Sequence, residues 1–260
     1  QTGPHARHVV PLRKYPEVAL TSNVQGGYMV NVSSANTSSS RTLHGAFDGI
    51  FDDSFGKGWQ SGARYSTTTG LPTSDPDNAT FTVAGVDYTG QWVKLELPQK
   101  IRVESILLSS CYNTTTTDDR RPENGVFLGS NDDTNWEVIK TFNNDLDYND
   151  LDFGQDSTAA RANSQATIRG ITNTSYYKYL MIVITKIATT NQYGPVQINE
   201  LEYYGYEETS DPDTSVDTKI TSQFNLPDTT GVKLYIDGDK GSTATDFSGE
   251  GHTLTENNAT

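Results

Sequence analysis

The carboxylates near residue 200 are the first side chains in this sequence that could do chemistry. Residues 196–205 have the sequence VQINELEYYG. Alternation along a strand would place Glu200 and Glu202 on one face together with Ile198 and Tyr204, and neither face would be cleanly apolar. Glu200 thus stands where a strand should settle into a core, and we take it as the first candidate functional residue.

Catalytic chemistry has little support. The histidines are scattered over unrelated segments, at His5, His8, His44 and His252. Cys111 has no partner at the level of sequence for a nucleophilic pair. A strand motif with paired carboxylates, as retaining glucanases use, is also missing from the sequence. We therefore predict that these residues do not form an enzyme.

Two acidic stretches partly match the sequence pattern of calcium-binding loops. Residues 145–156, DLDYNDLDFGQD, have Asp150 at the sixth position instead of glycine, and no glutamate closes the loop. This pattern favours a solvated acidic loop. Residues 237–241, DGDKG, favour a turn before a strand.

Composition restricts the partners. The 260 residues carry a formal net charge of -14, and only 33% of them are hydrophobic. Such an acidic surface repels phosphate backbones and anionic lipid headgroups, which disfavours nucleic acid and membranes and leaves neutral sugars, cations or basic protein surfaces. One cysteine excludes an internal disulfide without fixing the compartment. No apolar run approaches the roughly 20 residues that span a bilayer.

The pattern of elements predicts an all-β protein. Helical periodicity is nearly absent, and short alternating or β-branched runs are separated by turn clusters, which is typical of a sandwich or barrel. In chain order these runs are 26–35, 91–111, 124–142, 176–187 and 196–206. We expect two strands separated by a turn at Pro98, a hairpin turning at 130–135, and core positions for Trp59, Trp92 and Trp136.

The ends of the chain differ from its middle. Residues 1–20 are basic and rich in proline, which predicts an extended arm or, equally, a solvated tail or leftover linker. Residues 207–231 are acidic and poor in apolar side chains, as in a linker, and 232–260 start a second β unit that stops before it could bury a core. The sequence is therefore expected to be a piece of something longer.

The order of these segments resembles the discoidin family, also called the coagulation factor 5/8 type C domain. The motifs that carry the likeness are GAFDG with the later Trp59, GQWVKLELPQKIRVESILL, NGVFLGSNDDTNWEVI, YYKYLMIVIT and INELEYYG. They cover about residues 21–206. The segment LYIDGDKGSTATDFSGEGHTLT is similar to the start of a concanavalin-like, laminin G type β domain.

The resemblance implies a discoidin-like antiparallel jelly-roll β-sandwich with binding loops at one end. It implies a carbohydrate-binding or adhesion module without enzymatic activity, and in many members a structural calcium ion near the termini. Carried over to this sequence, the calcium ligands would include Asp48 and Glu200. The family usually has Thr or Ser two residues before the tryptophan, where this chain has Lys57 in a lengthened loop.

That departure leaves two alternatives for the metal site. Asp52, Asp53 or Ser54 could replace the missing ligand, so that the predicted set is Asp48, Asp53, Ser54 and Glu200. Equally, Lys57 could pair with a carboxylate where the ion has been lost.

Candidate sugar-binding residues lie on the predicted loops. Sugar binding requires an aromatic face for the pyranose and planar polar groups for its hydroxyls. The residues that meet this requirement near the ligand loops of the family are Arg64, Tyr65, Arg120, Arg121 and Tyr193, with Tyr148 on a further loop.

Two functions follow as expectations. The first is a non-catalytic module that binds glycans or a glycoprotein surface within a longer multi-module protein, at an extracellular, virion or cell surface. The alternative is a structural assembly protein, such as a minor capsid, fibre or appendage component of a large DNA virus or a cell surface. In that case the fold is a scaffold, and the basic N-terminal arm docks on neighbouring subunits.

Overall fold

The protein is all-β over the residues that the structure describes. This computed structural model describes residues 12–36, 41–51, 57–62, 64–113, 118–148, 164–188 and 194–208, without the side chains of 112–113 and 118–119. Residues 1–11, most of the predicted linker and the predicted second β unit lie outside this description. No helix in the described part is long and apolar enough to cross a membrane.

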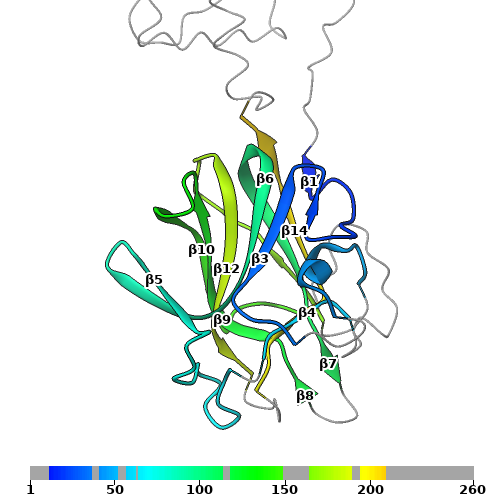
Figure 1. The fold of residues 1–260 in the computed structure, drawn as a ribbon. Helices are drawn as coiled ribbons and strands as arrows, with labels where there is room; N and C mark the ends of the chain where they lie inside the picture. Colours follow the sequence, from blue (N-terminus) through cyan, green and yellow to red (C-terminus); the bar gives the residue numbers. More distant parts are fainter. Residues whose placement is uncertain are drawn as a thin grey trace, which may run out of the picture. The chain divides into compact units, whose positions relative to one another are not determined.

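The described elements are short strands, with one long exception and one 3-10 helix (Figure 1). The strands are β1 (Arg13–Tyr15), β2 (Val24–Gln25), β3 (Tyr28–Val32), β4 (Trp59–Gln60), β5 (Ala79–Val83), β6 (Val86–Ser109), β7 (Tyr112–Asn113), β8 (Asp118–Asp119), β9 (Pro122–Ser130), β10 (Trp136–Asn143), β11 (Gln165–Ile168), β12 (Tyr177–Ile187), β13 (Gln197–Ile198) and β14 (Glu200–Glu207). The 3-10 helix η1 spans Leu43–Phe47.

One continuous strand, β6, connects both layers of the sandwich. Its residues 91–96 pair with β12, and residues 93–96 also pair with β3 on the other side. Beyond Pro98 its residues 101–109 pair with β14, and 106–109 also pair with β11. The prediction of two strands separated at Pro98 is therefore wrong, because the backbone stays extended there and only the pairing partners change.

The strands that pair with β6 before Pro98, extended by β9 and β10, form one layer of the sandwich. The strands that pair with β6 after Pro98, extended by β1, form the other. One layer follows the order β3-β6-β12-β9-β10, and the other follows β11-β6-β14-β1, with antiparallel pairing throughout. The predicted hairpin is confirmed as β9 and β10. The predicted all-β antiparallel sandwich is confirmed as well.

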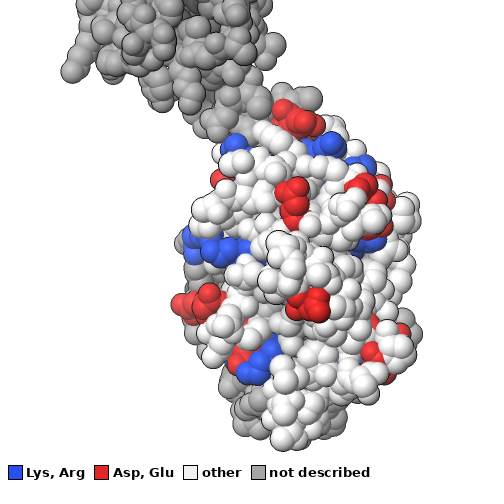
Figure 2. Space-filling model, turned by 90° about the vertical axis from the view of Figure 1, so that its left-hand side faces the viewer, with Lys and Arg blue, Asp and Glu red and all other residues white. Residues whose placement is uncertain are grey.

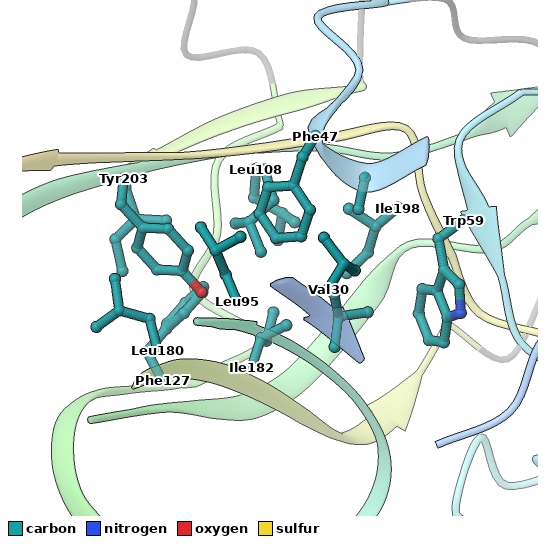
Figure 3. Close-up of a cluster of buried hydrophobic side chains, with 14 of the residues drawn as sticks. Val30, Phe47, Trp59, Leu95, Leu108, Phe127, Leu180, Ile182, Ile198 and Tyr203 are labelled. Carbon is teal, nitrogen blue, oxygen red and sulfur yellow. The ribbon is translucent and has the colours of Figure 1, made fainter. Parts of the chain in front are cut away.

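The core lies between these layers and is built by period-two alternation. Val93, Leu95 and Leu97 of β6 face inward together with Leu180 and Ile182 of β12. Figure 3 shows Leu95, Leu180 and Ile182 converging with Phe47, Trp59, Phe127, Ile198 and Tyr203. Each fully buried side chain of this size contributes about 1.5–3 kcal/mol. Trp59 is completely buried, as the sequence predicted.

A second, smaller apolar cluster covers the outer face of the first layer. The hairpin formed by β5 and the start of β6 contributes Val83, Phe81 and Tyr88. These residues pack against Val126, Leu128, Met181, Val183, Trp92, Trp136 and Val138. Trp92 and Trp136 are therefore half-buried outside the main core. Their predicted place in the core is wrong, because alternation directs them to the other face of the sheet.

The N-terminal segment enters the sandwich earlier than expected. Strand β1 pairs with β14, Tyr15 is 2% exposed and Leu20 is 1% exposed. The predicted arm over residues 1–20 therefore does not hold for residues 13–20, which belong to the sandwich.

Candidate functional site

Two carboxylates lie side by side on the outer face of β14. Glu200 and Glu202 pair with Ser109 and Leu107, whereas the alternating residues Leu201 and Tyr203 point into the core. The predicted shared face of the two glutamates is confirmed. Ile198 does not share it, because the strand is interrupted at Asn199 and Ile198 packs in the core. Both glutamates are only 2% exposed.

Each buried glutamate has its own donors. Lys14 Nζ donates to Glu202 Oε1 at 2.9 Å, and the Tyr204 hydroxyl donates to Glu202 Oε2 at 2.5 Å. The Gly49 N–H donates to Glu200 Oε2 at 2.8 Å. Glu202 is thus satisfied by a cation of the N-terminal strand, whereas Glu200 receives a neutral donor from the loop that follows η1.

The electrostatics at Glu200 differ accordingly. Burial, followed by the charges of Glu202 and Asp48, raises the pKa of Glu200 well above its ordinary value. Burial also raises the pKa of Asp48 to about 6, although the Ile50 N–H and the charge of Lys57 lower it in part. Both carboxyls therefore lack sufficient counter-charge in the ionised state.

This donor set fits a cation that prefers oxygen. Asp48 and Glu200 come from segments far apart in the sequence, and they meet because Gly49 contacts Glu200. A calcium ion would supply the missing positive charge and would take carboxylate oxygens from both residues. Within the part of the chain that the structure describes, no group of three or more His, Cys, Asp or Glu is arranged to hold a metal ion. Asp53 and Ser54 lie outside the described residues.

The loop that carries Lys57 is held tightly against the closing strands. Gly58 has a φ of +72°, and a Cβ atom there would lie 2.3 Å from the carbonyl oxygen of Ile198. The Lys57 carbonyl accepts a hydrogen bond from Gln197 Nε2 at 3.0 Å. Lys57 is therefore near the carboxylates, and both predicted alternatives, a metal ion or Lys57 as counter-charge, stay open as proposals.

A second group of predicted residues lies in the segments that follow β4 and precede β9. Tyr65 is 3% exposed, and its hydroxyl donates to the Ile184 carbonyl at 2.7 Å and accepts the Gln91 N–H at 2.9 Å. The buried ring cannot stack on a ligand, so we remove Tyr65 from the predicted binding residues.

Arg64 is engaged within its own loop. Its guanidinium contacts Asp77 Oδ2 at 2.8 Å and Asp75 Oδ2 at 3.1 Å, and its side chain is 30% exposed. The Arg64 carbonyl accepts the Thr73 N–H and the Asn78 amide. Arg64 therefore organises the 64–78 loop, and it presents only part of its guanidinium to solvent.

Arginines gather at the start of β9. The guanidinium of Arg121 lies over the Tyr148 ring, 4.8 Å from its centroid, and the Tyr148 hydroxyl donates to the Pro122 carbonyl at 2.7 Å. Arg120 is 8% exposed, and its backbone bonds to Cys111 and Gln197. These contacts bring Arg121 and Tyr148, which come from different predicted loops, into one rigid unit.

Arg41 adds a third positive charge to this end. Burial, and then the charge of Arg120, lower the pKa of Arg41. Sequence reasoning missed Arg41, and only the fold brings it close to Arg120. Tyr193 lies outside the described residues.

Comparison with known proteins finds similar structures at low sequence identity. No family model matches the chain, and no curated protein matches it. The family 32 carbohydrate-binding module of Clostridium perfringens NanJ, solved in complex with galactose, has a TM-score of 0.41 and 12% identity over 68% of this chain and 93% of its own. A C. perfringens module of the same family, solved with GalNAc-β-1,3-galactose, has a TM-score of 0.42 and 14% identity over 70% and 96%.

A fucolectin from striped bass (Morone saxatilis) serum is similar to the same degree. Its TM-score is 0.43, with 13% identity over 70% of this chain and 47% of its own. The ligands named for these structures are properties of those proteins. At such scores we draw no functional argument from the likeness.

Proposed function

We propose that residues 12–208 form a non-catalytic carbohydrate-binding module that serves adhesion within a longer, multi-module surface protein. The observation that carries this proposal is Arg121 stacked on Tyr148 just before the start of β9. Planar guanidinium donors on a fixed aromatic ring suit ligand hydroxyls, because the geometry is set before the ligand arrives. Arg120 precedes Arg121 in the chain, and its charge acts on Arg41.

Of the histidines and the cysteine, only His44 and Cys111 belong to the described residues, and both are held by the fold. His44 lies 3.0 Å from Asn23 Oδ1, and burial lowers its pKa. Cys111 is fully buried. This arrangement supports a binding role, and a localisation at an extracellular, virion or cell surface is part of the same proposal.

A glycan-array screen of the full chain with Arg121→Ala tests the proposal. We expect the wild-type protein to bind a defined set of glycans and Arg121→Ala to lose at least about tenfold in affinity, which is about 1.4 kcal/mol. Arg102→Ala is the matched control, because Arg102 also lies over a tyrosine, Tyr206, at 5.7 Å, but on the strand that pairs with the closing strand. A folded wild-type protein that binds no glycan would contradict the proposal.

We also propose that a structural calcium ion stabilises the Asp48–Glu200 contact. Calcium at 100 times its Kd would raise the free energy of unfolding by about 2.7 kcal/mol. Glu200→Gln should abolish this calcium-dependent rise in melting temperature, whereas Glu104→Gln, at the half-exposed partner of Arg102, should leave it intact. An unchanged melting temperature in calcium and in chelator would favour Lys57 as the counter-charge.

The alternative function is assembly through a basic arm, and part of the predicted arm belongs to the sandwich. Lys14 is bound to Glu202, and Arg13 lies 3.4 Å from Glu17 and 3.5 Å from Glu207. The arm in this hypothesis is thus reduced to residues before 12. Deletion of residues 1–11 separates the two functions, since assembly should be lost under the alternative while glycan binding should survive under our proposal.

A further inference from the structure

The outer face of the first layer carries a straight row of side chains across five strands. Register defines it: Met29 pairs with Glu96, Glu96 with Tyr179, Tyr179 with Ser130, and Ser130 with Trp136. Directly paired residues in antiparallel strands share a face, so all five side chains project from the same side. We call this set the outer row.

Two aromatic residues of the outer row stand on either side of a small one. Trp136 and Tyr179 are half-buried, whereas Ser130 between them is 1% exposed. Because neighbouring strands lie about 4.8 Å apart, the two aromatic residues are separated by about 10 Å. This separation is close to the length of a disaccharide. Ser130 is buried beneath the side chains around it, so the two aromatic residues, and not the serine, form the surface.

The platform is rigid before any ligand binds. Phe81 of the β5 hairpin contacts Trp136 and Trp92 edge to face, with ring centroids 6.3 Å apart in both pairs. Asp132 accepts hydrogen bonds from the N–H groups of Thr134 and Asn135, which fixes the turn between Ser130 and Trp136. Aromatic side chains on regular strands give more precise surfaces than loops do.

Most charges around the outer row are paired with one another, although the charge of Asp132 also acts on Tyr179. Lys94 Nζ contacts Asp133 Oδ2 at 2.6 Å and lies 5.9 Å from the ring centroid of Tyr179, while Lys178 Nζ lies 3.7 Å from Glu96. Figure 2 shows the side of the molecule that carries β5 and β10. There acidic and basic side chains are scattered between wide uncharged areas, although the whole chain has a formal charge of -14.

We propose that the outer row is a second ligand-binding surface, which takes an extended, neutral polysaccharide chain. Sugar rings present apolar C–H faces that stack on Trp136 and Tyr179, and hydroxyl edges that the head groups of Lys94, Asp133 and Glu96 can bond. A neutral ligand matches a surface on which Lys94 and Lys178 are already paired with carboxylates and Asp132 would repel an anion. The chain would run across the strands, and this site shares with the proposed function only the class of its ligand.

The outer row and the Arg121 site use different residues on different elements. The outer row lies where β9 ends and β10 begins, whereas Arg121 precedes β9. Binding of a polymer at the outer row and of a small glycan at Arg121 can therefore be tested separately.

Affinity gel electrophoresis of the full chain in xyloglucan, galactomannan, laminarin and polygalacturonate tests this proposal. We expect retardation by at least one neutral polymer and none by the acidic one. Trp136→Ala and Tyr179→Ala should each weaken binding at least about tenfold, while Tyr179→Phe and Trp136→Phe retain much of it. Tyr179→Ala is decisive if Trp136→Ala loosens the Phe81 contacts, because Tyr179 is outside them.

The controls separate this inference from the proposed function. Arg121→Ala should leave polymer binding unchanged, and so should Val86→Ala, at an exposed apolar residue of the same hairpin outside the row. No retardation of the wild-type chain, or full retardation of Tyr179→Ala, would overturn the inference whatever the glycan array gives. A change in sedimentation with Trp136→Ala while polymer binding is unaffected would also overturn it, and would indicate a contact between copies.

Discussion

The loop end and the outer row both hold candidate binding side chains in fixed positions, but they do so in different ways. At the loop end, which comprises the segments after β4 and before β9, polar side chains come from irregular segments. The structure fixes them through bonds to backbone and carboxylates, as with Arg64 and Tyr65. Along the outer row, the register of five strands fixes the positions, and the side chains need few bonds of their own. A binding surface on strands therefore leaves more of each aromatic side chain available.

This difference shows that the exposure of an aromatic side chain depends more on its place in the fold than on its residue type. Tyr65 is a loop tyrosine, and it is buried. Trp136 belongs to a strand, and it is half-exposed. Exposure follows from which side of the sheet a residue faces, because each layer has one core face and one outer face.

The largest expected effect is at Tyr65. Tyr65→Phe leaves the Ile184 carbonyl and the Gln91 N–H without their buried partner, so the free energy of unfolding should fall by about 2–4 kcal/mol. Chemical denaturation measures this decrease. Affinity per folded molecule for any array glycan should be unchanged, and a selective loss of glycan affinity without a loss of stability would return Tyr65 to the binding site.

The next effect concerns the hairpin that supports the outer row. Phe81→Ala removes two edge-to-face contacts and opens part of the second cluster, which should cost about 2 kcal/mol. Tryptophan emission should shift to longer wavelength as Trp92 and Trp136 gain solvent. Wild-type stability together with an unshifted spectrum would show that the hairpin does not hold the platform.

A smaller effect is expected at Arg64. Arg64→Met removes the contacts to Asp75 and Asp77 in a partly exposed setting, so we expect a decrease of about 1 kcal/mol. Raising the salt concentration should reduce the difference between variant and wild type, since exposed charges are screened. A difference that is independent of salt would assign the effect to packing of the arginine stem.

The smallest effect is expected at Asp132, which is exposed. Hydrogen bonds from the Asn135 N–H, then the Asn135 side chain and the Thr134 N–H, hold the pKa of Asp132 well below its ordinary value. A lowered acid pKa stabilises the fold above the unfolded-state value of about 3.9, and this stabilisation is lost as the pH falls below it.

The measurement is the stability of Asp132→Ala against wild type as a function of pH. The wild-type advantage should be full at neutral pH and should shrink steadily below about pH 3.9. An advantage that stays constant to lower pH would show that the carboxylate does not fix the turn through its charge.

Much of the fold was accessible from the sequence. Alternation and turn residues predicted the β9–β10 hairpin, the buried strand β12 and the shared face of Glu200 and Glu202. The continuity of β6 was not accessible, because proline at 98 normally marks a turn, and only the neighbouring strands show that the backbone stays extended there.

The candidate site was less accessible, because it depends on contacts between distant segments. The stacking of Arg121 on Tyr148 joins residues 27 positions apart, and the Lys14–Glu202 pair joins residues 188 positions apart. The role of Trp136 required knowing which face of the sheet is covered. Local sequence patterns give the alternation along a strand, but they do not say which face the core occupies.

The pairing of β1 with β14 has a mechanical consequence. Arg13 lies opposite Gly205, and Tyr15 lies opposite Tyr203, so the chain enters and leaves the sandwich at the same point. Tension on a chain that carries this module would pull β1 and β14 apart one hydrogen bond at a time, instead of shearing many bonds at once. The module would lie beside a stretched chain, and it would separate first at Arg13, which lies opposite Gly205 and contacts Glu207.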